Sequence, residues 1–299
     1  PGNALPVGFH RLEASPARRR RVKRGKPQEP GLRARVDGLD WPVRAISLNL
    51  NGWRSACRKG LLEWLGAQDA DVVCLQEVKA GPQHEPAVPG YGVLWHPAER
   101  PGYSGVALLA RARPDEVACG LGDAAFDREG RLLRADFGSL TVLSVYVPSG
   151  SSGPERLEYK LAFLEAFLAY LSRLLEGCRA QGRELLLCGD LNIAHRPIDL
   201  TNWRANLRTS GFLPEERAVF DRLLGLGLVD ATRHLLGPDT ALYSWWSLRS
   251  GARARNVGWR LDYQLVTPGL AALALKTAIP REPVFSDHAP VVLEYGWTL

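Results

Sequence analysis

The sequence predicts an α/β fold in which β-sheets pack on one another and helices cover them from outside. Two observations carry this prediction: short apolar or alternating runs recur between Gly/Pro turns, and stretches with helical periodicity lie between them. Layers of sheet on sheet with flanking helices bury such a mixture most simply. A third observation, the lack of a repeat with a period of about 20 to 50 residues, excludes a solenoid.

Seven runs predict strands that are buried on at least one face, because they are apolar or alternating and are bounded by turns. They are RAISLNL (44–50), VVCLQE (72–77), GVALLAR (105–111), LTVLSVYV (140–147), ELLLCGD (184–190), LDYQLV (261–266) and PVVLEY (290–295).

The clearest helix is predicted from Pro154, near its first turn, to Gly177, where it ends. Its leucines recur at three- and four-residue spacing, so one apolar stripe faces a sheet; they are Leu157, Leu161, Leu164, Leu168, Leu171 and Leu175. Shorter helices are expected at 58–67 and at 214–226. In the first of these, Leu61, Leu62 and Leu65 are expected to point inward.

Composition bounds the class of protein and its partners. With 299 residues, 45% hydrophobic and 23% charged, the chain can form a soluble protein of one or two domains. Residues 1–42 hold ten Lys or Arg against four acids, which accounts for the whole net charge of +6. The remaining 43–299, expected to be the folded domain, is neutral and must bind any polyanion through a local basic face.

The segment 1–42 is predicted to be a disordered basic arm, because it contains RRRRVKRGK (18–26) and no periodic apolar pattern. Nonspecific attachment to nucleic acid, a solvated tail and an over-long start-site assignment all remain open for this arm.

No run approaches the roughly 20 apolar residues of a membrane-spanning helix. No apolar segment of about 7 to 15 residues follows the basic stretch, as a secretory signal would require. We therefore expect a cytoplasmic protein without a membrane partner. The five cysteines form no CxxC pair, and Cys74 and Cys188 lie inside apolar runs, which indicates buried thiols in a reducing compartment.

Polar residues end or begin several of the predicted strands. Burying one such group costs a few kcal/mol unless it is paired, so their recurrence predicts a shared edge of the stacked sheets. For Asn49 alone, a turn or strand-end cap would be sufficient. The residues are Asn49, Asn51, Glu77, Tyr146, Asp190, Asn192, Asp262, Asp287 and His288.

Seven motifs in this order and spacing resemble the exonuclease III family of apurinic/apyrimidinic (AP) endonucleases, within the endonuclease/exonuclease/phosphatase superfamily. The resemblance extends from about Ile46 to Tyr295. GDLN and SDH alone recur across the superfamily, whereas all seven together are specific. The motifs are LNLNG, VVCLQEVKA, GYSGVALLAR, YVPSG, GDLNIAHRPIDL, NVGWRLDY and SDHAPV.

The resemblance implies a four-layer αββα sandwich of the DNase I-like type, with two mixed sheets packed face to face and 43–299 as the catalytic domain. It also implies metal-dependent hydrolysis of DNA phosphodiesters: incision 5′ to abasic sites, 3′ to 5′ exonuclease action and removal of 3′ blocking groups. The expected partner is abasic or 3′-blocked double-stranded DNA. The enzyme is expected to be a monomer, nucleoid-associated if the source is bacterial.

The metal prediction rests on Glu77, Asn51 and Asp287, whose oxygens are hard ligands suited to Mg²⁺ or Mn²⁺. No His/Cys cluster with zinc spacing competes with them in the sequence.

The catalytic prediction is carried over from the family. Asp190 is the candidate that orients or deprotonates the attacking water, and Asn192 and Asn49 hold it by hydrogen bonds. His288 would donate to a phosphate oxygen while Asp262 favours the charged form of its imidazole. The sequence leaves open whether Asp190 or His288 is the base; we favour Asp190.

Three further features complete the expected site. Tyr146 would offer a hydroxyl donor to the phosphate. By resemblance, Trp245, Trp259 and Leu261 line the apolar pocket for a flipped-out abasic sugar. The neighbouring segment would contact DNA through Arg249, Arg253, Arg255, Arg260 and Asn256. His195 and Asp199 are interpreted as loop architecture.

Two departures from the family bear on substrate choice: Asn51 stands where some relatives carry Asp, and Ser149 stands where many carry Asn. These departures bear on the balance between AP incision and exonuclease or 3′ phosphatase work, not on the reaction class, so a 3′ exonuclease/3′ phosphatase with weak AP incision stays open. Two further alternatives are a superfamily phosphatase acting on a non-DNA phosphoester and an inactive DNA-binding module. The Trp- and Arg-rich segment 243–263 argues against the phosphatase.

Overall fold

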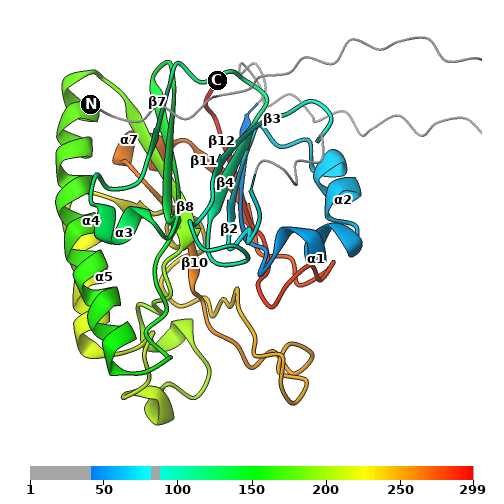
Figure 1. Ribbon diagram of the computed structural model, residues 1–299, viewed down its shortest axis with the longest axis vertical. Coiled ribbons are helices and arrows are strands. Elements are labelled where there is room, and N and C mark those ends of the chain that lie inside the picture. Colours follow the sequence, from blue (N-terminus) through cyan, green and yellow to red (C-terminus); the bar gives the residue numbers. More distant parts are fainter. Residues whose placement is uncertain (1–41, 82–87, 299) are drawn as a thin grey trace, which may run out of the picture.

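Two six-stranded mixed sheets pack face to face in the computed structural model, and helices cover both outer faces (Figure 1). The structure describes residues 42–81 and 88–298, so the predicted basic arm, apart from Pro42, lies outside the described residues. The predicted four-layer fold is confirmed. In the described ranges, no helix combines the length and the apolar character needed to cross a membrane.

The first sheet has the strand order β11-β12-β1-β2-β4-β3. Its strands are β1 (Val43–Asn49), β2 (Val72–Gln76), β3 (Gly92–His96), β4 (Val106–Ala110), β11 (Ala274–Ala278) and β12 (Val291–Tyr295). The second sheet has the order β5-β6-β7-β8-β10-β9. Its strands are β5 (Glu116–Cys119), β6 (Leu132–Phe137), β7 (Leu140–Tyr146), β8 (Glu184–Asp190), β9 (Val229–Asp230) and β10 (Asp262–Val266).

All seven predicted runs are strands. Successive side chains along a strand point to opposite faces of the sheet, so they belong to different parts of the core. Along β1, Ala45 points into the layer between the sheets, whereas Ile46 points to the helices on the outer face. This follows from the two-residue period of a strand. The strands β3, β5, β6, β9 and β11 were not predicted.

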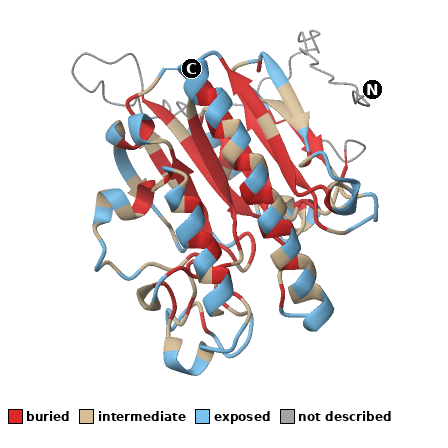
Figure 2. Ribbon diagram, turned by 90° about the vertical axis from the view of Figure 1, so that its left-hand side faces the viewer, coloured by how far each residue is buried: buried red, intermediate tan, exposed pale blue. Residues whose placement is uncertain are grey.

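The longest helix, α4 (Pro154–Ala180), packs with α5 (Pro214–Gly225) over the second sheet. The predicted end at Gly177 is wrong: Gly177 lies on the exposed face, and the buried stripe continues to Cys178, so the helix runs on to Ala180. Figure 2 shows that these helices are buried on the face toward the sheet and exposed on the outer face.

The first sheet is covered by α1 (Trp53–Arg58) and α2 (Leu61–Gln68). The single helix predicted at 58–67 is wrong at its start, because Gly60 adopts φ +87° and separates the two helices. Leu61 and Leu65 are buried as expected, but Leu62 is only half-buried. The short helices are α3 (Ala124–Asp127), α6 (Ala231–Leu236) and α7 (Pro268–Ala272).

Strand direction gathers the predicted site residues at one edge of the sandwich. The parallel pairs β1/β2 and β7/β8 end there, and the antiparallel strands β10 and β12 begin there. Behind this edge, buried polar side chains join the sheets: Gln76 bonds to Ser144, and Gln264 donates to the backbone oxygens of Ala45 and Val291.

Candidate active site

Asn49 links the two sheets at the strand ends. Its Nδ2 lies 2.9 Å from Oε1 of Glu77 and 2.8 Å from Oδ2 of Asp190, so one amide donates to carboxylates of both sheets. Asn49 is fully buried, and its backbone oxygen accepts a hydrogen bond of 2.6 Å from Ser286. The amide therefore holds Asp190 of the second sheet and Glu77 of the first in a fixed relation.

Asp190 and Asn192 form a tight turn at the end of β8. The Asn192 backbone N–H donates to Oδ1 of Asp190 over 2.9 Å, and its Nδ2 donates to the Val147 carbonyl over 2.8 Å. Asn192 adopts φ +51°, a conformation that Asn tolerates better than most residues. Burial raises the pKa of Asp190 to about 7, despite the opposing charge of His288.

His288 lies beside this carboxylate. Its Nδ1 is 2.8 Å from Oδ2 of Asp262, and its Nε2 is 3.8 Å from Oδ2 of Asp190. Burial alone would lower the pKa of His288, but Asp262 and Asp190 outweigh it and raise the pKa to about 10. Ser244 donates to the same Asp262 oxygen and accepts from the Asp262 backbone N–H, which fixes that carboxylate.

Tyr146 lies directly opposite Asp190 in the parallel β7/β8 pair. The residue is 8% exposed, and its ring packs under the guanidinium of Arg131. Burial and the neighbouring carboxylate of Glu77 hold the pKa of Tyr146 well above its ordinary value. The hydroxyl therefore stays protonated and can donate.

The three predicted metal ligands form one connected group. Nδ2 of Asn51 donates to Oδ1 of Asp287 over 3.0 Å. Lys79 joins this pair to Glu77, because its Nζ lies 2.5 Å from Oδ1 of Asn51 and 3.0 Å from Oε2 of Glu77. Burial would raise the pKa of Glu77, but Lys79 and Asn49 hold it below its ordinary value, so the carboxylate is ionised.

The chemistry of this group fits a divalent cation. Its donors are two carboxylates and an amide oxygen, the hard ligands that Mg²⁺ and Mn²⁺ prefer. A geometric grouping instead brings ligand atoms of Glu77, Asp190 and His288 within 4.8 Å of one another. Imidazole suits Zn²⁺, Cu²⁺ and Fe²⁺ better than Mg²⁺ or Mn²⁺, which prefer oxygen ligands, so His288 is the poorer ligand for a hard cation. The oxygen set is the better fit.

The three residues predicted to line an apolar pocket pack together beside this group. The indoles of Trp245 and Trp259 meet edge to face at 6.4 Å between ring centroids, and both pack against a cluster that contains Leu261. The indole N–H of Trp245 donates to Oδ2 of Asp287 over 3.0 Å. The indole pair and the predicted metal ligands are thus joined directly.

The predicted basic face is only partly present. Arg249 and Arg255 are exposed, and Asn256 is exposed while accepting from the indole of Trp246. Arg253 is half-buried and donates to the backbone oxygens of Arg281, Ser286 and His288, so its guanidinium braces the loop before β12.

Arg260 as a phosphate contact is wrong. The residue is 1% exposed, and its guanidinium forms ion pairs with Asp199 at 2.8 Å and Asp230 at 2.6 Å. Asp199 also pairs with Arg233, which agrees with its interpretation as loop architecture. His195 has the same role, because its Nε2 lies 2.7 Å from Asp221.

Sequence reasoning missed three contributors: Lys79, Ser244 and Ser286. Lys79 stands two residues after Glu77 in VVCLQEVKA, and a cation so close to a metal-binding carboxylate could have been noticed. The two serines carry no comparable sequence signal. Their role depends on pairings between distant segments, such as the 2.6 Å bond from Ser286 to the Asn49 carbonyl.

A family model described as the endonuclease/exonuclease/phosphatase family matches residues 46–288. The chain belongs to this family. It is a phosphoesterase of the exonuclease III type, since it is 40% identical over 253 residues to a Bacillus subtilis exodeoxyribonuclease, covering 84% of this chain and 98% of that protein. It is also 38% identical over 264 residues to the DNA repair nuclease APEX1 of Danio rerio, covering 86% and 83%.

Solved structures agree with this membership. An AP endonuclease from Archaeoglobus fulgidus matches with a TM-score of 0.77 and 30% identity, covering 85% of this chain and 99% of that one. The 3′ phosphatase NExo from Neisseria, bound to a product DNA hairpin, matches with a TM-score of 0.76 and 28% identity, covering 85% and 100%.

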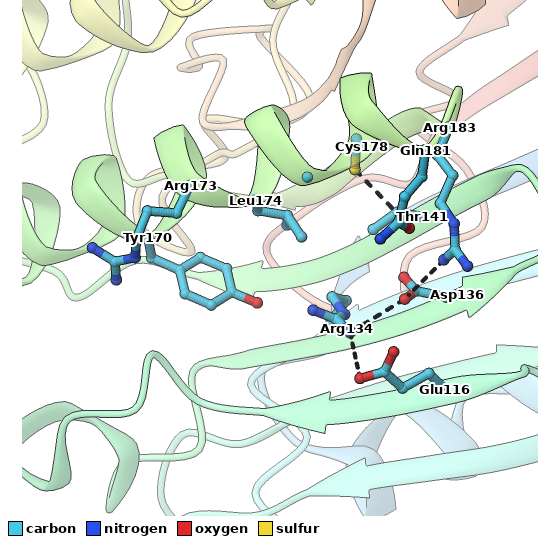
Figure 3. A pocket seen from close by; sticks show the side chains of 11 residues that line it. Glu116, Arg134, Asp136, Thr141, Tyr170, Arg173, Leu174, Cys178, Gln181 and Arg183 are labelled. Carbon is cyan, nitrogen blue, oxygen red and sulfur yellow. Dashed lines mark hydrogen bonds and ion pairs between the residues drawn. The ribbon is translucent and has the colours of Figure 1, made fainter.

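A separate cavity of about 310 Å³ lies at the start of β7 and β8, the opposite end of the second sheet from the site (Figure 3). Arg134 pairs there with Glu116 at 2.7 Å and Asp136 at 3.2 Å, and Arg183 reaches Asp136 at 3.0 Å. The cavity is lined by none of the predicted site residues. It is therefore remote from the predicted site residues.

Proposed function

We propose that this exonuclease III-type enzyme is a DNA repair nuclease that hydrolyses duplex DNA 5′ to abasic sites and at 3′ ends, with Mg²⁺ or Mn²⁺ as cofactor. One observation carries the proposal: a buried carboxylate, Asp190, lies between an amide and a charged imidazole at the strand ends that also carry the oxygen ligands and the indole of Trp245. The named relatives, an exodeoxyribonuclease and a DNA repair nuclease, support DNA as the substrate.

Asp190 is the residue best suited to orient and deprotonate the attacking water. A general base works best when its pKa is near the operating pH, and burial raises the pKa of Asp190 to about 7. His288, with its pKa raised to about 10, is already protonated at neutral pH and cannot accept that proton. The same charge makes His288 a donor to a phosphate oxygen, where negative charge grows during the reaction.

Asn49, Asn192 and Tyr146 position these groups. Asn49 and Asn192 donate to the two oxygens of Asp190 and restrict how the carboxylate can turn. Tyr146 offers a second neutral donor from the opposite strand. Glu77, Asn51 and Asp287 would hold the divalent ion, which when bound supplies electrophilic help to the phosphate and the leaving oxygen.

The substrate proposal rests on the neighbouring pocket. Trp245, Trp259 and Leu261 form an apolar surface beside the ligands, which suits a sugar without its base. Arg249 and Arg255 lie exposed on the adjoining loop and can approach DNA phosphates without losing an internal partner that the structure shows.

The decisive experiment measures cleavage of a duplex that contains an abasic-site analogue, in the presence of Mg²⁺, Mn²⁺ or EDTA. We expect a nick 5′ to the lesion with either metal and none with EDTA. Equal product with EDTA, or none with either metal, would exclude this mechanism. Asp190→Asn should bind the duplex as the wild type does and lose cleavage by about 10²- to 10⁴-fold, the usual contribution of a general base.

The balance among related activities needs its own comparison. Ser149 stands where many relatives are expected to carry Asn, and its hydroxyl bonds to that of Ser151 at 2.9 Å. The NExo relative is named both a 3′ phosphatase and a 3′-5′ exonuclease. Rates on abasic, recessed 3′ and 3′-phosphate duplexes, with a small phosphoester as control, would rank the activities. Faster turnover of the small phosphoester would support the non-DNA phosphatase alternative, and binding without cleavage would support the inactive module.

A further inference from the structure

A buried ion pair lies behind the turn that Asp190 and Asn192 form at the end of β8, which we call the catalytic turn. Lys160, in the second turn of α4, is fully buried, and so is Glu216 in the first turn of α5. The ammonium of Lys160 is 2.6 Å from Oε1 of Glu216 and 2.8 Å from the backbone oxygen of Asn192. The pair thus contacts the turn that presents Asp190, although neither side chain reaches the cleft.

Lys160 differs from an ordinary buried ion-pair residue because its ammonium also donates to the backbone oxygen of Asn192. Asn192 adopts a left-handed conformation at φ +51°, and its N–H and side chain hold Asp190 together with the Asn49 amide. Turning the Asn192 peptide would move its N–H away from Oδ1 of Asp190. The N–H and the carbonyl of Asn192 belong to the two peptide groups on either side of its Cα. Because Lys160 donates to the carbonyl, the second peptide group is held as well, and this opposes the rotation.

Glu216 extends the same control to the aromatic pocket. Its carboxylate accepts from the backbone N–H groups of Gly211 at 2.5 Å and Leu213 at 3.0 Å. Gly211 adopts φ +97°, and a side-chain carbon there would lie 3.3 Å from both the Asn192 oxygen and the ring of Trp259. Gly211 therefore fills the narrow space between the catalytic turn and the pocket wall.

Joining α4 to α5 does not by itself require this pair. Apolar side chains of both helices already pack in one cluster, and Arg222 of α5 makes an exposed two-bond ion pair with Glu165 of α4. Burying two charges is costly, and well-packed apolar residues often replace such a pair without loss. An apolar residue in place of Lys160 could not supply the bond to the Asn192 carbonyl, which acts on the turn that presents Asp190.

We propose that Lys160 is a positioning residue for phosphodiester hydrolysis: its ammonium holds the Asn192 carbonyl and so sets the aim of the Asp190 carboxylate. This inference rests on the proposed function of the site. Because the contact acts on the geometry of the reacting group and not on DNA binding, its loss should lower kcat and leave KM nearly unchanged.

The test uses Lys160→Met, which keeps the length of the side chain and removes the donor. We expect kcat on the abasic duplex to fall by about 10- to 100-fold, as a small misplacement of a catalytic group can cause, with KM within about twofold of wild type. Lys160→Arg restores a donor and should recover most of kcat. The matched control is Arg222→Met, which removes the exposed α4–α5 pair and should keep wild-type kcat.

Two outcomes would overturn the inference: wild-type kcat in folded Lys160→Met, or an equal loss of kcat in Arg222→Met. If Lys160→Met does not fold, the double variant Lys160→Met/Glu216→Gln leaves no unpaired buried charge and should show the same fall. Failure of the proposed function is distinguishable, because the wild type itself would then cleave no DNA duplex with either metal.

Discussion

Asp262 stands directly opposite Asp190 in the antiparallel pairing of β10 with β8, and its Oδ2 lies 2.8 Å from Nδ1 of His288. Strand register therefore fixes Asp262 relative to Asp190, the proposed base, and a hydrogen bond fixes it relative to His288, the proposed donor to phosphate.

Replacing Asp262 by Asn should reduce catalysis through His288. Asp262 is the main group that raises the pKa of His288 against the effect of burial, so the imidazole of the variant becomes neutral at lower pH. We expect kcat to fall by about 100-fold, the usual loss for a donor to developing charge, and the loss to be larger at alkaline pH. Steady-state rates between about pH 6 and 9 measure this effect. A profile parallel to that of the wild type would contradict it.

The same pair predicts how stability depends on pH in the metal-free protein. The pKa of His288 is raised to about 10 in the folded state, compared with about 6.5 in an unfolded chain. The stabilisation is therefore complete below about pH 6.5 and is lost as the pH rises through about 10. Urea unfolding should show the free energy of unfolding falling more steeply over this window in the wild type than in His288→Gln. Parallel curves would mean that the folded pKa is not raised.

Asn51→Asp should strengthen metal binding. The substitution adds a carboxylate beside Asp287 in place of an amide donor, and ligand charge is a main determinant of affinity for hard cations. We expect the Mg²⁺ concentration for half-maximal rate to fall about tenfold. Glu77→Gln is the matched opposite change and should raise it. An unchanged requirement in both variants would place the ion elsewhere.

Arg260 and Arg249 should differ in what their loss affects. Arg260→Ala leaves Asp199 and Asp230 buried without this partner, so the free energy of unfolding should fall by about 3–5 kcal/mol. Arg249→Ala removes an exposed side chain and should change stability by less than about 0.5 kcal/mol. Its effect should be weaker DNA binding with a salt slope lower by about 1. Chemical unfolding and DNA titration at several salt concentrations separate the two.

Removing residues 1–40 should affect DNA affinity but not chemistry. This segment carries the excess of basic residues, while the catalytic groups all lie in the domain that follows. We expect turnover on short duplexes to stay near the wild-type rate and the slope of log affinity against log salt to become shallower. An unchanged slope would show that the segment does not touch DNA.

The buried part of the site was predictable because strand patterns determine where strands end. Asn49, Glu77, Asp190 and Asp262 each stand at the end of a run whose apolar character is clear in the sequence, and parallel or antiparallel pairing brings such ends to one edge. The edge strands β5 and β11 were missed because none of their residues is fully buried, which leaves little apolar periodicity to detect.

Burial of charged side chains was not predictable. Arg249 and Arg260 look alike in an Arg-rich segment, yet one is exposed and the other is enclosed by Asp199 and Asp230. Their partners lie in distant parts of the sequence, so only the folded topology distinguishes them. Lys160 was missed for the same reason, since its partners Glu216 and Asn192 lie 56 and 32 residues away.

The buried polar contacts between the sheets give the sandwich a defined registration. The catalytic groups are divided between two separately hydrogen-bonded sheets, so sliding one sheet over the other would pull Asn49 from Asp190 without breaking a single strand pairing. Gln264 of the second sheet donates to backbone oxygens of β1 and β12 in the first sheet, and these hydrogen bonds oppose that movement. Gln264 is buried and lies away from the strand ends that carry the site residues. Its replacement should first disturb the alignment between the site residues of one sheet and those of the other.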